Sequence, residues 1–310
     1  MHYLPPWVLN KYNPIAVLAA LALDYLYPRH EGLALALHPV HTAFLMARRL
    51  APPYSGAARG VASWLAVMAT HLAPAALLLY ASWRLLGPPG WVVAAALVYK
   101  ASIAVRLLAL HASRASRALR EGRLGDARRE AQNLVRRPTA TLGPGHVASA
   151  VIESLAESLV DSVASPLFYA AILGPLGALA QRIANTLDGA LGFKTPQYIR
   201  AGKASAYADT ILNYIPARLA ALTIALTAPL AGGSTAEALK TIAANHAATE
   251  SRNAGYPLSA IAGALGVCLE KKGHYTINPG KPCPNPDHIN KAIHLLYTNT
   301  LIWITPTLHP

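Results

Sequence analysis

Three carboxylates lie within nine positions of an apolar stretch in the middle of the chain. Glu153, Glu157 and Asp161 are spaced four and four apart, although the 310 residues hold only 14 aspartates and glutamates. Residues four apart share one face of a helix, so the spacing predicts an acidic stripe. Like charges at that spacing repel, and apolar surroundings raise the cost of ionising them. We therefore expect a compensating cation, either a bound Mg²⁺ or a facing arginine cluster, and favour a functional role over a solvated acidic face.

Two pairs of short oxygen-bearing side chains follow downstream. Asn185 and Asp188 are three apart, and Asp209 and Asn213 are four apart, so each pair shares a helix face. Such side chains suit Mg²⁺, which binds one or two carboxylates together with water and phosphate oxygens. For either pair alone, helix capping is the commoner role. Basic residues interleave with these pairs and fit phosphate binding and plain ion pairing between helices equally well; they are Arg182, Lys194, Arg200, Lys203, Arg218 and Arg252.

Histidines and cysteines indicate no further site. His38 and His41 are the closest pair among 12 histidines, and no carboxylate stands at ligand spacing, which disfavours a transition metal. Cys268 and Cys283 have no second pair, so we expect structural thiols rather than a zinc site or a disulfide framework. The sequence also lacks a Walker loop, a Gly-x-Ser-x-Gly turn and a Cys/His nucleophile pair. Any ATP must therefore be held without a Walker motif.

The composition is that of an integral membrane protein. Charged residues make up 13% of the chain and hydrophobic residues 54%, whereas about a quarter of a soluble domain is charged. The net charge of +13 suits anionic lipid or a phosphate-bearing ligand. Nucleic acid is disfavoured because the arginines lie between apolar segments rather than along one face with interleaved aromatics. The first residues lack the pattern of a secretory signal, so we expect the first apolar segment to stay in the mature chain.

Several apolar segments have the length of membrane-spanning helices. Crossing a hydrocarbon core takes about 20 residues, and residues 63–86 and 91–110 meet that length. Gly-Pro-Pro-Gly at 87–90 joins them and predicts a tight helical hairpin. Gly174-Pro175 breaks the apolar stretch 165–180 and predicts a re-entrant pair of half-helices packed against protein. Shorter candidate spans are residues 14–27, which contain Asp24, 215–230 and 292–304.

Two polar stretches lie between the apolar segments. Residues 111–146 carry eight arginines and are predicted to be cytoplasmic by the positive-inside rule. We favour a helix lying on lipid headgroups over a substrate role for this stretch. Residues 234–290 predict a loop-rich polar insert, and no internal repeat is evident. The predicted fold is thus an all-α, polytopic membrane protein of the cytoplasmic membrane with broken helices, forming a single membrane domain over residues 1–310.

Five blocks of residues resemble the adenosylcobinamide-phosphate synthases of cobalamin biosynthesis, a family of integral membrane proteins. They occur in the family's order between residues 38 and 267 and are specific only in combination. The blocks are His38-Pro-Val, Val151-Ile-Glu-Ser-Leu-Ala-Glu-Ser-Leu-Val-Asp161, Asn185-Thr-Leu-Asp188 with Gly192-Phe-Lys, Asn213-Tyr-Ile-Pro-Ala-Arg218, and Asn253-Ala-Gly-Tyr-Pro257 with Ala262-Gly-Ala-Leu-Gly-Val267.

The resemblance implies an ATP- and Mg²⁺-dependent ligation. Adenosylcobyric acid would be joined through an amide to (R)-1-amino-2-propanol phosphate, or to the free aminoalcohol. It also implies contact with other membrane enzymes of corrinoid assembly. The implied catalytic residues are Glu153, Glu157, Asp161, Asp188 and Asp209, of which the first four are predicted Mg²⁺ ligands. The implied substrate and phosphate contacts are Arg182, Asn185, Lys194, Lys203, Asn213, Arg218, Arg252 and Asn253.

The chain departs from the family pattern at several positions. Ser158 stands where the family often has Asn, Thr210 and Pro138 each stand where it often has Asp, and Leu258 where it often has Glu. Those family side chains cannot be essential if this chain is active. The departures narrow the predicted chemistry to the acids that remain.

Two other function classes fit part of the pattern. A membrane prenyl or alcohol-phosphate transferase also holds Mg²⁺-bound diphosphate with Asn/Asp pairs, but it explains neither the acidic stripe nor the block at Asn253. A transporter would use broken helices and intramembrane acids. It predicts paired half-helices in two symmetric halves, whereas the sequence indicates only one clear break within an apolar segment.

Overall fold

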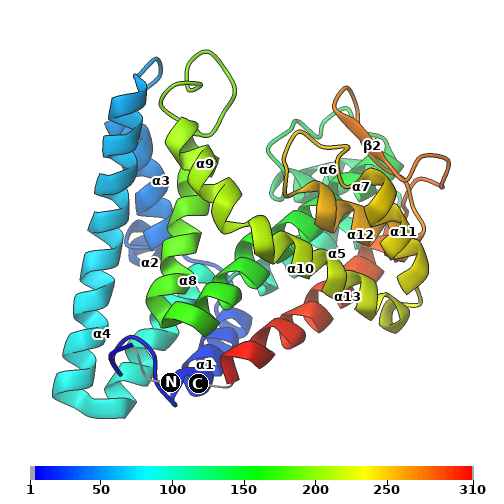
Figure 1. Cartoon of the computed structure of the whole chain (residues 1–310). Coiled ribbons are helices and arrows are strands. Elements are labelled where there is room, and N and C mark those ends of the chain that lie inside the picture. The colour runs from blue at the N-terminus through cyan, green and yellow to red at the C-terminus, as the bar shows by residue number, and fades with distance from the viewer. Residues whose placement is uncertain (1–3, 309–310) are drawn as a thin grey trace. The chain divides into compact units, whose positions relative to one another are not determined.

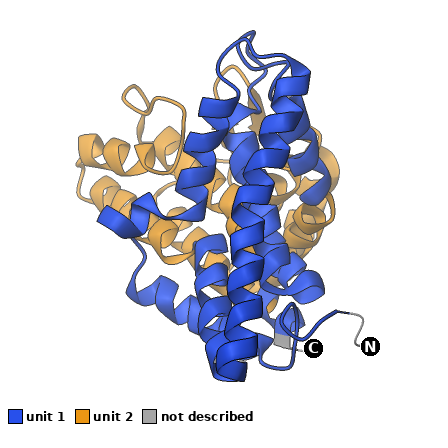
Figure 2. Ribbon diagram, turned by 90° about the vertical axis from the view of Figure 1, so that its left-hand side faces the viewer, with its two compact units in different colours: residues 1–104, 165–213, 303–310 blue, residues 105–164, 214–302 orange. Residues whose placement is uncertain are grey.

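The computed structural model describes residues 4–308 (Figure 1). Within this range the chain is helical apart from one two-stranded hairpin, so the prediction of an all-α fold is confirmed. The chain forms two compact units, each built from discontinuous segments (Figure 2). Unit 1 takes the described residues of 1–104, 165–213 and 303–310, and unit 2 takes residues 105–164 and 214–302.

Unit 1 is a bundle of helices around α4 and α8. Ala43 and Ala47 of α3 pack with Leu179, Ile183 and Leu187 of α8 in its core. Small residues four apart on α3 let its backbone approach its neighbours closely. The helices of unit 1 are α1 (Asn13–Leu26), α2 (Gly32–Ala36), α3 (Pro39–Leu50), α4 (Ala57–Ser102), α8 (Ser165–Leu191) and α9 (Lys203–Leu212), with the 3₁₀ turn η3 (Thr305–Leu308) at the boundary with α13.

A buried ion pair joins α1 to α4 within unit 1. Nζ of Lys100 lies 2.8 Å from Oδ1 of Asp24, and both side chains are buried. Beside this pair, Tyr99 donates a hydrogen bond to Asn13. The acid in the predicted span 14–27 is therefore neutralised by a cation from another helix, as an acid in apolar surroundings requires.

Both long helices of unit 1 break at the same short motif. Gly87 of α4 has φ 65° and ψ −158°, and Gly174 of α8 has φ 64° and ψ −155°, a region essentially restricted to glycine. Each glycine stands in Leu-Gly-Pro-x-Gly, where the proline opens the following helix without needing a donor. Figure 1 shows the ribbon of α4 turning sharply at its lower end. Both predicted breaks, at 87–90 and at Gly174-Pro175, are therefore present.

Three stretches of helix are long and apolar enough to cross a membrane: Ala57–Arg120, Pro144–Leu191 and Tyr214–Ala231. The predicted span 14–27 corresponds to α1, a shorter apolar helix. The predicted span 91–110 is wrong at its end, because helix α4 stops at Ser102 and Ile103 is extended (φ −107°, ψ 138°). Ile103 and Val105 are β-branched, which favours extended backbone at this interruption. The predicted span 292–304 lies within α13, which is not among the three stretches.

Unit 2 is also largely helical. Helices α5 and α6 bury an alanine face, including Ala112, Ala115, Ala127 and Ala131, and expose most of their arginines, so residues 111–146 are mainly helical. The elements of unit 2 are α5 (Arg106–Arg120), α6 (Leu124–Gln132), α7 (Pro144–Leu159), the π turn η1 (Val160–Ala164), α10 (Tyr214–Thr227), the 3₁₀ turn η2 (Ala228–Ala231), α11 (Thr235–Asn245), α12 (Gly255–Leu265), β1 (Leu269–Lys271), β2 (Tyr275–Ile277) and most of α13 (Pro286–Ile304).

The predicted loop-rich insert is instead packed structure. Within residues 234–290, α11 packs on α12, and every residue of α12 except Tyr256 is buried. The expectation of a loop-rich insert is wrong because α12 is apolar throughout and contributes to the core of unit 2. Beyond it, β1 and β2 pair antiparallel, with Lys271 opposite Tyr275 and Gly273 at φ 75° in the turn. This hairpin carries one of the site residues described below.

Candidate active site

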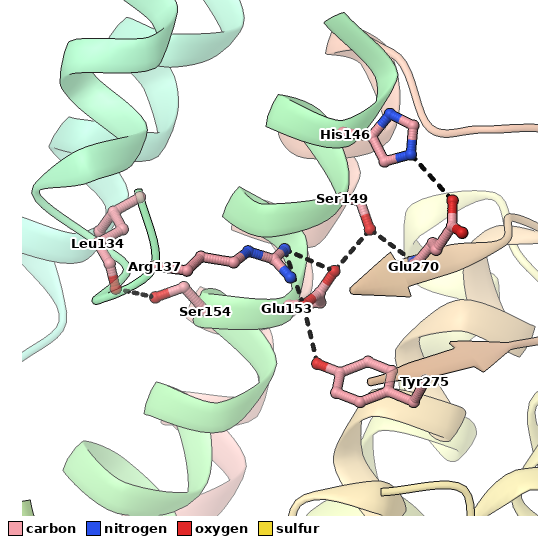
Figure 3. Close-up of polar contacts among 8 residues, drawn as sticks. All are labelled: Leu134, Arg137, His146, Ser149, Glu153, Ser154, Glu270 and Tyr275. Atoms are coloured by element: carbon pink, nitrogen blue, oxygen red, sulfur yellow. Dashed lines mark hydrogen bonds and ion pairs between the residues drawn. The ribbon is translucent and has the colours of Figure 1, made fainter. Parts of the chain in front are cut away.

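Glu153 lies at the centre of a buried polar cluster in unit 2 (Figure 3). Nη2 of Arg137 lies 3.1 Å from both carboxylate oxygens. Oγ of Ser149 donates to Oε1 at 2.6 Å, and Oη of Tyr275 donates to Oε2 at 2.8 Å. Glu153 and Ser149 are one turn apart on α7, Arg137 precedes that helix, and Tyr275 belongs to β2. Three segments distant in sequence thus converge on one carboxylate that is 4% exposed.

Arg137 supplies the cation that the acidic stripe was expected to need. A carboxylate has about four lone-pair directions, and these four hydrogen-bond contacts use them. A metal ion could bind Glu153 only if one of these donors left, so the geometry favours an anchoring role for this residue. Burial and the negative charges of Glu153 and Glu157 raise the pKa of Tyr275, which keeps its hydroxyl protonated as a donor.

The other two acids of the stripe are placed differently. Glu157 is exposed one turn beyond Glu153, and electrostatic attraction links it to Lys271, Arg137 and Arg136. Asp161 is half-buried in the π turn η1, where the regular α-helical register ends. The prediction of one regular stripe is therefore wrong for Asp161, because α7 stops at Leu159. Short π segments inside helices often mark functional sites.

The hairpin that carries Tyr275 is fixed to α7 by two further contacts. The backbone N–H of Glu270 donates to Oγ of Ser149 at 2.9 Å. Nε2 of His146 lies 2.9 Å from Oε2 of Glu270. Ser149 therefore contacts both the carboxylate and the hairpin, and the hairpin's position is coupled to that of Glu153.

A second polar cluster forms in unit 1 around Asp209. Nδ2 of Asn185 lies 3.0 Å and Nδ2 of Asn213 lies 2.7 Å from the same oxygen, Oδ1 of Asp209. Asn213 is held in turn by Gln181 at 3.0 Å and Ser165 at 2.5 Å, both of which donate to its Oδ1. The expectation of helix capping is wrong for Asn185 and Asp188, which lie inside α8, whereas Asn213 directly follows α9. The two predicted pairs therefore contribute to one cluster.

The electrostatics of this cluster suit a cationic or protonated partner. Burial raises the pKa of Asp209, while the hydrogen bonds from Asn185 and Asn213 and the charge of Arg182 act in the opposite direction. Both amides contact Oδ1, so Oδ2 accepts no hydrogen bond from the described residues. Oε1 of Gln181 is buried and has no hydrogen-bond partner among them. Two oxygen acceptors of the cluster are thus left for a ligand.

Asp188 is held one turn from the end of α8. A Cβ added at Gly192 would lie 1.8 Å from Oδ1 of Asp188, so the glycine makes room for this carboxylate. Arg182 donates to Oδ1 of Asn185 at 3.4 Å. Lys194 is exposed on the segment between α8 and α9, and Lys203 is exposed at the start of α9. Unit 1 thus holds seven of the predicted site residues: Arg182, Asn185, Asp188, Lys194, Lys203, Asp209 and Asn213.

The remaining predicted residues lie in unit 2 with the acidic stripe. The guanidinium of Arg218 lies 3.5 Å from the centre of the Tyr214 ring and 4.3 Å from that of Tyr256. Its Nη1 donates to Oδ1 of Asn253 at 3.4 Å. Arg252 is exposed beside this contact. Arg218 and Asn253 are therefore brought together, and the guanidinium makes cation–π contacts with two aromatic rings.

The donor groups in the two units differ in how well they suit Mg²⁺. No cluster of three or more His, Cys, Asp or Glu side chains within residues 4–308 is arranged to hold a metal ion. Mg²⁺ in phosphate-binding sites needs only one or two carboxylates, because water and phosphate oxygens complete its shell. The free oxygens of the Asp209 cluster are hard donors of the required kind. A Mg²⁺–phosphate complex therefore fits unit 1 better than Glu153, and the metal roles of Glu157, Asp161 and Asp188 stay predictions.

Several functional side chains were missed by sequence reasoning. Tyr275 contacts Glu153 across 122 positions, and no local pattern indicates that contact. Ser149 stands four residues before Glu153, a spacing that could have indicated it. Gln181 and Ser165 gave no signal, since their hydrogen bonds to Asn213 follow from packing and not from local spacing.

Comparison with known proteins gives one consistent answer. A family model described as "CobD/Cbib protein" matches residues 17–296. The "Probable cobalamin biosynthesis protein CobD" of Aeropyrum pernix is 53% identical over 264 residues, covering 85% of this chain and 82% of the relative. The protein of the same description from Thermoplasma volcanium is 30% identical over 95% of this chain and 97% of its own length. The "Cobalamin biosynthesis protein CobD" of Dehalococcoides mccartyi is 35% identical and covers 69% of each chain.

No solved structure matches the chain. The family match spans all five blocks and all thirteen predicted site residues, from His38 to Val267. The resemblance drawn from those blocks is therefore confirmed: the chain belongs to the CobD/Cbib protein family.

Proposed function

We propose that this enzyme of cobalamin biosynthesis is an ATP-dependent ligase that joins adenosylcobyric acid to (R)-1-amino-2-propanol phosphate, or to the free aminoalcohol. The corrinoid carboxylate attacks the terminal phosphorus of ATP, and ADP leaves. The amine then attacks the resulting acyl phosphate, inorganic phosphate leaves, and the amine gives up one proton as the amide forms. Family membership and the names of the relatives support the pathway. The ligation is what the resemblance to the adenosylcobinamide-phosphate synthases implies, and the residues described above support its phosphoryl-transfer step.

The Asp209 cluster is the observation that carries the proposal. An acid, two amides and an arginine are gathered on two helices of an otherwise apolar unit, and one carboxylate oxygen stays available. Phosphoryl transfer needs mainly positioning and charge stabilisation, which such groups supply. Mg²⁺ held there would neutralise phosphate oxygens and make the phosphorus more electrophilic.

Each neighbouring residue has a defined task in this proposal. The amides of Asn185 and Asn213 hold Oδ1 of Asp209, so that Oδ2 points to the ligand. Arg182, Lys194 and Lys203 contact phosphate oxygens, and arginine forks suit this geometry. In unit 2, Glu153 is locked by Arg137 and positions α7, and Glu157 remains a candidate catalytic acid. Asp188 and Asp161 remain candidate ligands.

The direct test supplies purified protein with adenosylcobyric acid, ATP, Mg²⁺ and either aminoalcohol. Mass spectrometry of the corrinoid product and release of ADP are measured together. We expect an amide product and stoichiometric ADP with at least one aminoalcohol. Absence of both under every lipid condition would exclude the ligase. ATP turnover in detergent, without a sealed membrane, also separates the ligase from a secondary transporter.

A pair of variants tests whether Asp209 takes part in the reaction. Asp209→Asn keeps an oxygen at the position of Oδ1 and removes the charge, so we expect at least about a hundredfold loss of turnover with the fold retained. Asp287→Asn is the matched control, because Asp287 is exposed on α13 and its ion pair among the described residues is with Arg120 at the surface. Equal activity of the two variants would refute the role of Asp209.

We also propose a multi-pass protein of the cytoplasmic membrane that contacts other membrane enzymes of corrinoid assembly. The three apolar stretches support membrane insertion. The arginines of residues 111–146 favour a cytoplasmic location for that segment. A single-cysteine variant, Cys268→Ser, leaves the exposed Cys283 as a reporter in unit 2. Labelling of Cys283 by an impermeant maleimide only after the inner face is opened supports this orientation, and labelling from outside contradicts it.

A further inference from the structure

A basic hollow between α5 and α6 in unit 2 is separate from the residues assigned to the ligation. It has a volume of about 280 Å³ and is lined by Arg114, Arg117, Ala118, Arg123, Asp126, Arg129 and Glu130. Four guanidinium groups face two carboxylates around it. None of these residues belongs to the Glu153, Arg218 or Asp209 clusters. The hollow therefore needs its own explanation.

The carboxylates of the hollow are already engaged. Asp126 pairs with Arg123 and Arg129, and Glu121 outside the hollow pairs with Arg123 as well. Oε2 of Glu130 lies 2.7 Å from Nδ1 of His111. These contacts leave no carboxylate of the lining for the two arginines on α5.

Arg114 and Arg117 are the unbalanced charges. Both are exposed on α5, three positions apart, and neither forms an ion pair or hydrogen bond with the described residues. Like charges at this spacing destabilise a helix, whereas an anion held between them would stabilise it. Two guanidinium forks converging on a hollow of this size match the oxygens of one phosphate group.

We propose that this hollow, between Arg114 and Arg117 on α5, Arg123 just before α6 and Arg129 on α6, binds a phosphate group. The phosphate belongs either to the headgroup of an anionic lipid or to a soluble phosphate ester. The lipid source is favoured by sequence position, because only three residues separate the end of the apolar helix α4 from the start of α5. The binding is independent of the ligation, since no residue of the hollow is assigned to that reaction.

The experiment compares the full-length double variant R114Q/R117Q with R49Q/K240Q. The control removes the same two charges from exposed residues on α3 and α11 that make no ion pair among the described residues. In the first arm, inorganic phosphate is titrated into protein in uncharged detergent at constant ionic strength, and binding is followed by ³¹P NMR line width. In the second arm, native mass spectrometry counts phosphatidylglycerol molecules retained from nanodiscs.

We expect R114Q/R117Q to weaken binding at least about tenfold in one arm, with R49Q/K240Q close to wild type. A loss in the phosphate arm identifies a soluble ester, and a loss confined to the lipid arm identifies a headgroup. Equal behaviour of the two double variants in both arms, including no binding by either, overturns the proposal. Because the four side chains are exposed, matching circular dichroism spectra should show that the fold is retained. Ligation by R114Q/R117Q is expected to persist, so its failure would bear on the proposed function and not on this site.

Discussion

Replacing Arg137 by glutamine would leave the Glu153 carboxylate in apolar surroundings without its cation. The side chain of Glu153 is 5% exposed and that of Arg137 is 18% exposed, so water can reach the arginine but hardly the acid. Removing one partner of a buried pair costs about 3–5 kcal/mol. The partial exposure of Arg137 places Arg137→Gln near the lower end, at about 3 kcal/mol. Ser149 and Tyr275 would still donate to the carboxylate and limit the loss.

A double-mutant cycle separates this pair from general damage. Glu153→Gln should cost about 1–2 kcal/mol, because the arginine left behind can still be hydrated. The double variant Arg137→Gln/Glu153→Gln should be less destabilised than the sum, with a coupling energy of about 2 kcal/mol. Unfolding by dodecyl sulfate in mixed micelles, followed by circular dichroism at pH 7, measures all three free energies. Tyr275→Phe should cost about 1.5 kcal/mol by removing one hydrogen bond to the charged group.

Arg123→Gln is the matched control for this cycle. Arg123 pairs with Glu121 and Asp126 at the surface, where ion pairs contribute about 0–1 kcal/mol. If Arg137→Gln costs no more than Arg123→Gln, or if the two changes in the pair are additive, the buried anchor assigned to Glu153 is wrong. The carboxylate would then be available as the metal ligand first predicted from the spacing.

Three further predictions follow from the same structure. Burial and the charges of His30, Arg182, Lys100 and His41 lower the pKa of His38 to about 4, and its neutral ring caps α3. The free energy of unfolding should therefore fall by up to about 3 kcal/mol as the pH drops from 6.5 through 4. In melting experiments, His38→Asn should cap the helix without that pH dependence. Gly192→Ala should displace the Asp188 carboxylate and lower ligation at least about tenfold, whereas Gly125→Ala, with open space around it, should not. Gly87→Ala and Gly174→Ala should both cause backbone strain of about 1–3 kcal/mol. Only Gly174→Ala would also place a Cβ 2.1 Å from the carbonyl oxygen of Val8, so this variant should show the larger fall in melting temperature. Equal falls in the two variants would contradict that packing.

Local patterns predicted the fold where the chemistry is local. The two glycine–proline breaks follow from the conformational limits of those residues, and both lie where the sequence indicates. The end of α4 at Ser102 and the packing of α12 were missed, because an apolar segment looks alike in a membrane span and in a protein core. Length and composition alone cannot separate those two environments.

The site was predictable in its residues more than in its contacts. The spacing of Asn185, Asp188, Asp209 and Asn213 pointed to oxygen donors on helix faces, and three of the four meet in one cluster. The pairing of Glu153 with Arg137 was one of two compensations that the sequence allowed. Its hydrogen bond with Tyr275 depends on how the hairpin packs on α7, which no local spacing encodes.

The acids of this chain differ in whether a cation neutralises them. That difference indicates the catalytic acids more clearly than the small number of acids in the sequence does. Asp24 is neutralised by Lys100, and Glu153 is neutralised by Arg137. Asp209 has amides in place of a cation and forms no ion pair with the described residues, and Glu157 is exposed beyond the locked Glu153. An acid already paired with a cation loses that ion pair if it binds a metal or takes up a proton, whereas Asp209 and Glu157 have cations nearby but form no ion pair with the described residues. Phosphate activation is therefore expected at Asp209, and Glu157 stays the candidate catalytic acid of unit 2.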